Sequence, residues 1–416
     1  MTAIFTFLSE GDGTARVGTA YTTARRSVLT ASFAYERDYL ARPSAYALDP
    51  ALPLSGGTAT QGLPRQGLPG AFSDAAPDRW GRNLISKRLR AEAAADGRTA
   101  PAVTEVDYLL GVSDETRQGA LRFAREQNGE FLRAEHDVPK LIALPQLMRA
   151  AEKVVADDPE EMSAVKLLLD AGTGSLGGAR PKASVKDGHR LLIAKFAHPD
   201  DEWSVIAWEK TALDLAADAG IDVPRTELVH VDGKPVLLLD RFDREGAERV
   251  GYISAMTLVQ SSDGEARDYV EIAEALAADG ASVAADLEQL WRRIAFSIAI
   301  HNTDDHLRNH GFLRRSSGWV LSPAFDVNPN PTLSASRVTS IGGSSDLKTD
   351  VTGLFSYAPT FGLTARRARA IAQEVADAAR AYRGAAVRNS VPEGELARFA
   401  PTLEAATGAL VASAPG

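Results

Sequence analysis

The sequence predicts an α+β fold in which strands and helices are concentrated in different parts of the chain. Three observations predict it: a hairpin pattern at the start, two strong hairpin signals in the middle, and helical periodicity in the last third. The chain has 416 residues, which allows about two or three domains. We expect an N-terminal β-rich subdomain of the small lobe over residues 1–150, the rest of the small lobe over 151–260 and a helical large lobe over 261–416.

The first part of the chain begins with a predicted hairpin. Strand-forming residues over 4–8 and 16–21 flank a Gly-Asp-Gly turn, the spacing of paired strands. Five prolines and five glycines over 43–70 exclude a helix or a central strand and predict a loop. Residues 83–95 carry helix formers and stop at Asp96-Gly97, so we expect a helix there.

Two Asp-Gly pairs mark the turns of two predicted hairpins in the middle of the chain. The strands lie over 182–185 and 190–196 around Asp187-Gly188, and over 226–231 and 235–240 around Asp232-Gly233. Asp and Gly tolerate positive φ, which both central residues of a type I′ turn require. A helix is predicted over 204–220 between the hairpins, with Ser204 as its cap and Gly220 as its stop.

The last third is predominantly helical. Helical periodicity extends over 268–279, 283–300 and 364–383, with apolar residues on one face of the last segment. A further hairpin is predicted over 312–314 and 319–321. The back two-thirds of the chain is therefore expected to be a lobe of hairpins with one helix, followed by a helical lobe.

The composition is that of an ordinary folded protein. Hydrophobic residues make up 44% and charged residues 24%, which excludes collagen, coiled coil and extensive disorder. The net charge of -9 disfavours nucleic-acid binding through the overall field of the protein. The absence of cysteine excludes disulfide scaffolds, thiolate zinc sites and cysteine nucleophiles. The start lacks the features of a signal peptide and no apolar run approaches ~20 residues, so we expect a cytoplasmic protein.

A glycine-rich segment precedes the first of the middle hairpins. Gly172-Thr-Gly-Ser-Leu-Gly177 satisfies the G-x-G-x-x-G pattern of phosphate-binding loops, which an ordinary turn can also satisfy. A Walker A loop would need a Gly-Lys-Ser/Thr ending and a Rossmann loop would need a helix, whereas Pro181 and the hairpin predict strands. A glycine-rich loop between antiparallel strands is the arrangement of protein kinases, in which a following strand carries a phosphate-binding lysine.

Lys195 lies near the end of that following strand. Its ammonium is a candidate contact for the α- and β-phosphates, although a lysine that protects an edge strand would give the same pattern. A kinase also needs an acid on the next helix to pair with this lysine. Glu209 is our candidate, with Glu202 and Glu227 still open, and a solvent-exposed helical glutamate remains the simpler interpretation.

Residues 301–310 form the most informative segment of the chain. They contain three of the seven histidines and the adjacent carboxylates of Asp304 and Asp305. Asp304 and Asn309 have the D-x-x-x-x-N spacing of a kinase catalytic loop, in which the Asp accepts the proton of the substrate hydroxyl and the Asn binds Mg²⁺. Asp326 follows the next predicted hairpin, which is the place of the magnesium-binding Asp of D-F-G.

Together these motifs resemble the HipA family, the bacterial serine/threonine kinase toxins of type II toxin–antitoxin modules. The resemblance covers nearly the whole chain and rests on Pro77-Asp-Arg-Trp-Gly81, Gly174-Ser-Leu-Gly-Gly-Ala-Arg-Pro-Lys182, Leu239-Asp-Arg-Phe-Asp243, Asn302-Thr-Asp-Asp-His-Leu-Arg-Asn309 and Phe325-Asp326. It implies a protein-kinase-like fold of two lobes with an extra N-terminal β-rich subdomain, and ATP with Mg²⁺ as the phosphoryl donor. It also implies a protein substrate such as an aminoacyl-tRNA synthetase, and a small helix-turn-helix antitoxin that carries the toxin to operator DNA.

The resemblance implies a role for individual residues by their positions in these motifs. Lys195 matches the phosphate-binding lysine, Asp304 the catalytic Asp, Asn309 and Asp326 the magnesium ligands, Gly174, Ser175, Gly177 and Gly178 the glycine-rich loop, and Asp240 to Phe242 the hinge that receives adenine. His306 either hydrogen-bonds the γ-phosphate or orders the loop. Ser175 also matches a serine whose autophosphorylation inactivates the kinase, because a phosphate there adds negative charge where the ATP phosphates must lie.

The sequence departs from the usual kinase motifs at two places, and two alternative functions remain open. His301-Asn-Thr303 replaces His-Arg-Asp, and Val327-Asn328 replaces Phe-Gly after Asp326. A metal-dependent phosphohydrolase is one alternative, with metal ligands drawn from His301, His306, His310, Asp304 and Asp305. It would leave Lys195 and the glycine-rich loop without a role. The other alternative is a catalytically inactive pseudokinase that scaffolds an antitoxin–DNA complex.

Overall fold

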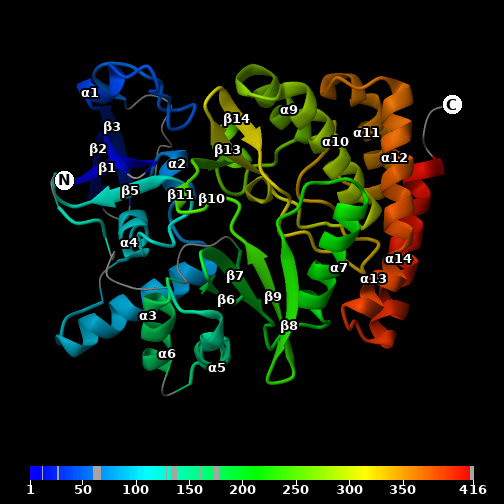
Figure 1. The fold of residues 1–416 in the computed structure, drawn as a ribbon, viewed down its shortest axis with the longest axis horizontal. Helices are drawn as coiled ribbons and strands as arrows, with labels where there is room; N and C mark the ends of the chain where they lie inside the picture. The colour runs from blue at the N-terminus through cyan, green and yellow to red at the C-terminus, as the bar shows by residue number, and fades with distance from the viewer. Residues whose placement is uncertain are drawn as a thin grey trace. The chain divides into compact units, whose positions relative to one another are not determined.

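The computed structural model describes residues 1–11, 13–25, 28–59, 67–100, 102–127, 129–132, 138–158, 161–172 and 178–412. The chain forms two compact units, each built from two stretches of sequence. The first consists of Met1–Pro199 with His230–Ile253, and the second of Asp200–Val229 with Ser254–Gly416. Figure 1 shows the elements of both units by label. The finer division at residues 150 and 260 remains a prediction.

The first unit begins with a five-stranded sheet in the order β4-β3-β2-β1-β5. The strands are β1 (Thr2–Glu10), β2 (Gly13–Arg25), β3 (Val28–Tyr35), β4 (Thr58–Ala59) and β5 (Leu121–Ala124). β1 and β2 pair in antiparallel register, which confirms the predicted hairpin. Ile4, Thr6 and Leu8 are buried on one face of β1 because alternate residues of a strand point to the same side.

The chain between β3 and the next sheet forms several helices. They are α1 (Arg37–Leu40), α2 (Gly70–Asp74), α3 (Arg79–Ala95), α4 (Glu105–Gly111), α5 (Leu144–Val155) and α6 (Glu161–Asp170). α3 starts four residues earlier than predicted, because the Asp78 side chain accepts a hydrogen bond from the Gly81 N–H and caps the helix. It ends as predicted, with Gly97 in the left-handed region at φ 63°.

A further sheet has the order β6-β7-β9-β8. Its strands are β6 (Lys182–Asp187), β7 (Arg190–Phe196), β8 (Thr226–Val231) and β9 (Lys234–Asp240). Both predicted hairpins form, but their turns differ. Asp232 and Gly233 both have positive φ, as a type I′ turn requires, whereas in the first hairpin Gly188 has positive φ and lies at the first central position, typical of type II′. The short strands β10 (Arg244–Glu245) and β11 (Glu248–Arg249) follow.

The second unit is mainly helical. Its helices are α7 (Val205–Asp218), α8 (Ala255–Leu258), α9 (Tyr269–Asp279), α10 (Val283–Ala299), α11 (Leu347–Ser356), α12 (Ala365–Arg380), α13 (Tyr382–Arg388) and α14 (Glu393–Ala412), and its hairpin is β13 (Gly311–Arg315) with β14 (Gly318–Leu321). The chain enters this part through β12 (Tyr252–Ser254). α10, α12 and α14 pack on one another (Figure 1). The single helix predicted over 364–383 is wrong in one respect, since α12 ends at Arg380 and α13 begins two residues later.

The hydrophobic core of the second unit surrounds α10. Trp291, Ile294 and Ile298 are fully buried, and the Trp291 indole N–H donates to the carbonyl of Leu354 at 3.1 Å. A satisfied indole lets this large side chain lie inside without an unpaired polar atom. α10 therefore gives a rigid base to the loop that follows it. None of the helices in the described ranges is long and apolar enough to cross a lipid bilayer.

Candidate active site

The loop over residues 301–310, called the catalytic loop below, leaves the end of α10 through an unusual backbone turn. His301 has φ 53°, which is uncommon for a residue with a side chain. Its Nε2 lies 3.0 Å from the carbonyl of Thr332, and its own carbonyl accepts the Asn330 N–H. Burial lowers the pKa of His301, the Arg337 charge acts in the same direction, and the contact with Thr332 opposes them. This histidine fixes the start of the loop rather than presenting itself to solvent.

Asp305 is the buried anchor of the catalytic loop. Its carboxylate accepts hydrogen bonds from the hydroxyls of Tyr269 at 2.5 Å and Ser297 at 2.9 Å, and lies 3.0 Å from Nε2 of His310. Burial alone would raise the pKa of Asp305, but the His310 charge, these hydrogen bonds and nearby Arg337 hold it well below its usual range. Asp305, considered from the sequence only as a metal ligand of the phosphohydrolase alternative, is therefore a structural carboxylate.

Asp304, its neighbour in sequence, lies on the exposed side of the loop. Partial loss of solvation raises the pKa of its carboxyl, and the negative charges of Asp326 and Asp305 act in the same direction, while His306 opposes them. A carboxylate whose pKa is raised is a better proton acceptor than an ordinary one. The two adjacent aspartates thus have opposite environments, and Asp304 is the one suited to chemistry.

Asn309 is held in a fixed orientation at the far end of the loop. Its Nδ2 donates to the carbonyl of Asp304 at 3.1 Å, and its backbone N–H donates to the carbonyl of His306 at 2.8 Å. Because the amide nitrogen is used in this way, Oδ1 is the atom that the side chain presents as an acceptor. An oriented amide oxygen is a suitable ligand for a hard cation such as Mg²⁺.

Asp326 follows the β13–β14 hairpin at a strained position. It has φ 57°, in the left-handed region that residues with side chains rarely occupy. The approach to it is fixed by the Ala324 N–H, which donates to the carbonyl of Asp222 at 2.7 Å. Backbone strain of this kind persists at sites where function requires it. The charge of Asp326 acts on Asp304, so the two carboxylates share one electrostatic environment.

The three histidines of the loop do not form one ligand set. His301 contacts the Thr332 carbonyl, His310 pairs with buried Asp305, and His306 lies beside Asp304. Within the described ranges, no group of three or more His, Asp or Glu side chains is arranged to hold a metal ion. Because the three histidines contact different partners, they do not offer the shared ligand set that the phosphohydrolase alternative needs for two metals. Asn309 and Asp326 would offer Mg²⁺ the one or two protein oxygens that commonly hold it together with substrate phosphates.

In the first unit, Lys195 lies on a central strand and is only 7% exposed. β7 is flanked by β6 and β9, so the edge-strand interpretation of this lysine is wrong. Lys182 lies directly opposite Lys195 on β6 and is 1% exposed. Two lysines in this register share a face of the sheet, and like charges so placed repel. Asp78 compensates one of them, with Oδ2 at 2.7 Å from the Lys182 ammonium.

The glycine-rich loop is described only at its two ends. Gly174, Ser175 and Gly177 lie outside the described residues. At the first end, Gly172 has φ 69° and its carbonyl accepts a hydrogen bond from the Thr116 hydroxyl. At the second end, the carbonyl of Gly178 accepts a hydrogen bond from the Lys182 ammonium at 2.9 Å.

The predicted hinge, Asp240 to Phe242, follows β9. The Asp240 carboxylate pairs with Arg190 of β7, and the Arg241 N–H donates to the Leu191 carbonyl. The ring of Phe242 lies 6.3 Å from that of Tyr252. The chain therefore leaves the sheet in a defined path.

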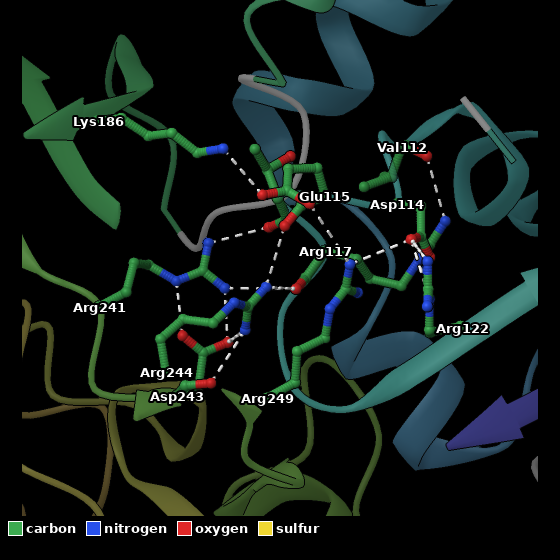
Figure 2. A network of polar contacts seen from close by, with 11 residues as sticks. Val112, Asp114, Glu115, Arg117, Arg122, Lys186, Arg241, Asp243, Arg244 and Arg249 are labelled. Atoms are coloured by element: carbon green, nitrogen blue, oxygen red, sulfur yellow. Dashed lines mark hydrogen bonds and ion pairs between the residues drawn. The ribbon is translucent and has the colours of Figure 1, made fainter. Parts of the chain in front are cut away.

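A cluster of charged side chains, called the hinge network below, fixes this path (Figure 2). It comprises Arg241, Asp243, Arg244 and Arg249 from the hinge side, and Asp114, Glu115, Arg117 and Gly119 from the loop between α4 and β5. Asp243 lies between Arg241 and Arg244, at 2.5 and 2.9 Å. Although burial would raise the pKa of Asp243, these two charges and the Gly119 N–H hold it well below its usual range.

Glu209 is buried in α7 and only 1% exposed, so the interpretation as a solvent-exposed helical glutamate is wrong. Ser204 does not cap α7 with its own side chain. Glu395 of α14 does so instead, accepting hydrogen bonds from the Ser204 N–H at 3.0 Å and from the Trp208 indole at 3.0 Å. Lys195 belongs to the first unit and Glu209 to the second, so their pairing remains a prediction.

Comparison with known proteins identifies the family. The family model "HipA-like C-terminal domain" matches residues 174–382, just over half of the chain, and "HipA N-terminal domain" matches residues 13–109. The chain belongs to the HipA family. No curated protein matches it.

A solved structure shows the same fold. HipA of Shewanella oneidensis MR-1, in a complex with HipB and operator DNA, is 16% identical to this HipA-family chain, with a TM-score of 0.68. The match covers 99% of this chain and 96% of that one. The kinase CtkA of Helicobacter pylori is 14% identical over 56% of this chain and 94% of that one, and its TM-score of 0.38 is too low to support an argument. The predicted HipA-like α+β fold is confirmed.

Several residues that hold the site in place were not predicted from the sequence. Tyr269 and Arg337 support the catalytic loop but lie 36 and 32 residues away from Asp305, so no local spacing predicts them. Thr116 and Arg117, which contact the glycine-rich loop and the hinge, lie in a stretch without a motif of its own. Asp78 and Lys182 stood within the family motifs, but nothing in those motifs predicted that they pair with each other.

Proposed function

We propose that this HipA-family chain is an ATP- and Mg²⁺-dependent serine/threonine protein kinase that acts as the toxin of a toxin–antitoxin module. The observation that carries the proposal is the contrast between Asp304 and Asp305. One carboxylate is exposed with a raised pKa beside Asn309 and Asp326, and the other is buried and fully bonded. Family membership supports the same conclusion.

The mechanism assigns each residue a task. Lys195, buried on a central strand, binds the α- and β-phosphates of ATP through its ammonium. Asp304 accepts the proton of the attacking serine or threonine hydroxyl, a role worth about 10²–10⁴-fold in rate. Asn309 and Asp326 supply oxygen ligands for Mg²⁺, which, when bound, offsets negative charge on the phosphates. His306, beside Asp304, orders the loop or contacts the γ-phosphate.

We also assign roles to the hinge and the glycine-rich loop, and name the substrate and the partner. The adenine lies against the hinge from Asp240 to Phe242, and the glycine-rich loop, including Gly174, Ser175, Gly177 and Gly178, covers the phosphates. Phosphorylation of Ser175 by the protein itself inactivates it, because the added charge repels ATP. The substrate is a translation factor such as an aminoacyl-tRNA synthetase. A small helix-turn-helix antitoxin binds the chain and brings it to operator DNA in the cytoplasm.

Labelled ATP tests this proposal. The purified protein is incubated with γ-labelled ATP and Mg²⁺ in a lysate, and mass spectrometry follows any newly labelled band and residue Ser175. We expect transfer by the parent and about 10²–10⁴-fold slower transfer by Asp304→Asn. Asp377→Asn, an exposed change in α12, is the matched control and retains transfer. Absence of transfer by the parent, with all components folded, would refute the kinase assignment.

A growth assay distinguishes the kinase hypothesis from the pseudokinase alternative. Expression of the parent is expected to arrest growth, and expression of Asp304→Asn is expected to allow it. A toxic Asp304→Asn protein of normal abundance would favour a scaffold whose effect needs no catalysis.

A further inference from the structure

One buried loop of the first unit contacts two parts of the proposed nucleotide site. This loop, residues 113–119 between α4 and β5, is called the bridging loop. Thr116 at its centre is fully buried. The Arg117 side chain ties the loop to the N-terminal helices, donating to the carbonyls of Ala75 at 2.8 Å and Leu109 at 3.0 Å. The position of Thr116 is therefore set by the N-terminal part of the chain.

The side chain of Thr116 meets the first end of the glycine-rich loop. Its hydroxyl donates to the Gly172 carbonyl at 2.8 Å, a carbonyl that the Ser184 hydroxyl also approaches at 3.4 Å. A Cβ atom at position 172 would lie 2.4 Å from Cγ2 of Thr116 and 2.6 Å from Oγ1. Gly172 also has φ 69°, which a residue with a side chain rarely adopts. The glycine and the threonine thus fit each other in shape and in hydrogen bonding.

The backbone of the same loop meets the hinge. The Thr116 carbonyl accepts a hydrogen bond from Arg241 at 2.9 Å, and the Arg117 carbonyl accepts one from Arg244 at 2.7 Å. In the other direction, the Gly119 N–H donates to Asp243 at 2.7 Å. Thr116 therefore bonds the entry of the glycine-rich loop with its side chain and the hinge with its backbone.

We propose that Thr116 is a positioning residue that sets Gly172, the described first end of the glycine-rich loop, relative to the hinge that receives the same ATP molecule. The inference rests on the proposed function, because it needs adenine at the hinge and phosphates under the glycine-rich loop. A loop held in its binding conformation loses less entropy when the nucleotide binds. Loss of the Thr116 hydroxyl lets the entry of the loop move while the hinge bonds, made by the backbone, remain.

The test is the affinity for ATP of three variants. Thr116→Val keeps the volume and removes the hydroxyl, and we expect Kd and KM for ATP to rise about threefold to tenfold, the effect of one hydrogen bond. Because Thr116 does not touch the reacting atoms, kcat should stay within about twofold. Thr116→Ser, which keeps the hydroxyl, should restore the parental affinity. Thr22→Val is the matched control, since the Thr22 hydroxyl donates to the Thr2 carbonyl in the first sheet.

Each outcome is decisive. Parental affinity in Thr116→Val, or an equal loss in Thr22→Val, overturns the positioning role and leaves the kinase proposal standing. A parent that binds no Mg²⁺–ATP overturns both. A lower unfolding temperature with unchanged Kd shows a merely structural threonine and also overturns the inference.

A measurement on the parent protein covers the case in which Thr116→Val does not fold. Amide hydrogen exchange is followed with and without Mg²⁺–ADP. We expect binding to slow exchange in residues 113–119 together with the hinge, and to leave β3 unchanged. Slower exchange at the hinge with no change in residues 113–119 contradicts the inference.

Discussion

The hinge network of the first unit and the catalytic loop of the second both bury an aspartate, yet they differ in what lies next to it. Asp243 is compensated by two arginines and a backbone N–H. Although burial would raise the pKa of neighbouring Glu115, its contact with Lys186 lowers it. Asp305 is compensated by His310 and two hydroxyls, and the residue before it has a raised pKa. The first arrangement fixes one carboxylate, whereas the second fixes Asp305 and leaves Asp304 exposed with a raised pKa, which is the environment that we propose for the catalytic base.

The partners of a buried carboxylate show whether its charge has a structural role. Guanidinium groups stay charged at all relevant pH values and bind carboxylates with two hydrogen bonds, so a carboxylate among arginines is fixed in its ionised form. Asp304 has no such partner among the interactions described here, and it lies near Asp326 instead. Burial, partner charge and neighbouring carboxylates together, rather than residue type, separate the two roles.

The largest effect on stability is expected at the hinge network. Asp243→Asn leaves Arg241 and Arg244 buried without their counter-charge, and we expect the free energy of unfolding to fall by about 3–5 kcal/mol. Guanidinium denaturation measures it. Asp232→Asn is the matched control, because Asp232 pairs with Arg149 at the exposed surface, and such pairs contribute about 1 kcal/mol or less. Equal losses in the two variants would contradict the assigned difference.

A further buried aspartate, Asp49, differs from Asp243 in how its contribution to stability depends on pH. Asp49 accepts hydrogen bonds from the N–H groups of Ala51 and Ala71, and burial raises its pKa from 3.8 to about 6. The folded state therefore binds a proton more tightly than the unfolded state. Its contribution to stability is present below pH 4 and is lost as pH rises through about 6, a change of about 3 kcal/mol.

The measurement is unfolding between pH 4 and 7 for the parent and Asp49→Asn. The variant should lack this part of the pH dependence, and its curve should be flatter over that range. An identical slope in both proteins would show that Asp49 is not the group responsible. Asp243 has the opposite sign, since its lowered pKa makes its contribution disappear only as the solution becomes strongly acidic.

The smallest effect is expected at a half-exposed carboxylate with neutral partners. Glu395→Gln weakens the hydrogen bonds to Ser204 and Trp208 that cap α7, and we expect a loss of about 0.5–2 kcal/mol, the range for helix caps. Thermal unfolding measures it. Glu393→Gln, an exposed change in the same helix, should have no measurable effect. A loss as large as that of Asp243→Asn would show that the charge of the partners does not determine how much the free energy of unfolding falls.

Much of the fold and the order of the site residues could be predicted from the sequence. The Asp-Gly turns, the stop at Gly97 and the apolar periodicity of α10 are local signals, and the structure confirms the elements that they predict. The predicted type of the first turn was wrong, because its two central residues are Gly188 and His189 rather than Asp187 and Gly188, and of these two only Gly188 has positive φ. The D-x-x-x-x-N spacing placed Asp304 and Asn309 on one loop, where the structure also finds them.

Long-range contacts account for what the sequence could not reveal. The burial of Asp305 depends on Tyr269, and the hinge depends on Thr116 and Arg117, which precede it by more than a hundred residues. No pattern in a single sequence states that such residues meet. The break between α12 and α13 was not predicted either, since both stretches have helical periodicity.

Comparing Asp304→Asn with Asp305→Asn in one experiment shows whether the two adjacent aspartates have separate tasks. Phosphoryl transfer from ATP and the free energy of unfolding are measured on both. The account predicts that Asp304→Asn loses about 10²–10⁴-fold in transfer with parental stability, and that Asp305→Asn loses about 1.5–3 kcal/mol of stability. Full transfer by a folded Asp304→Asn protein, or parental stability of Asp305→Asn, would contradict it.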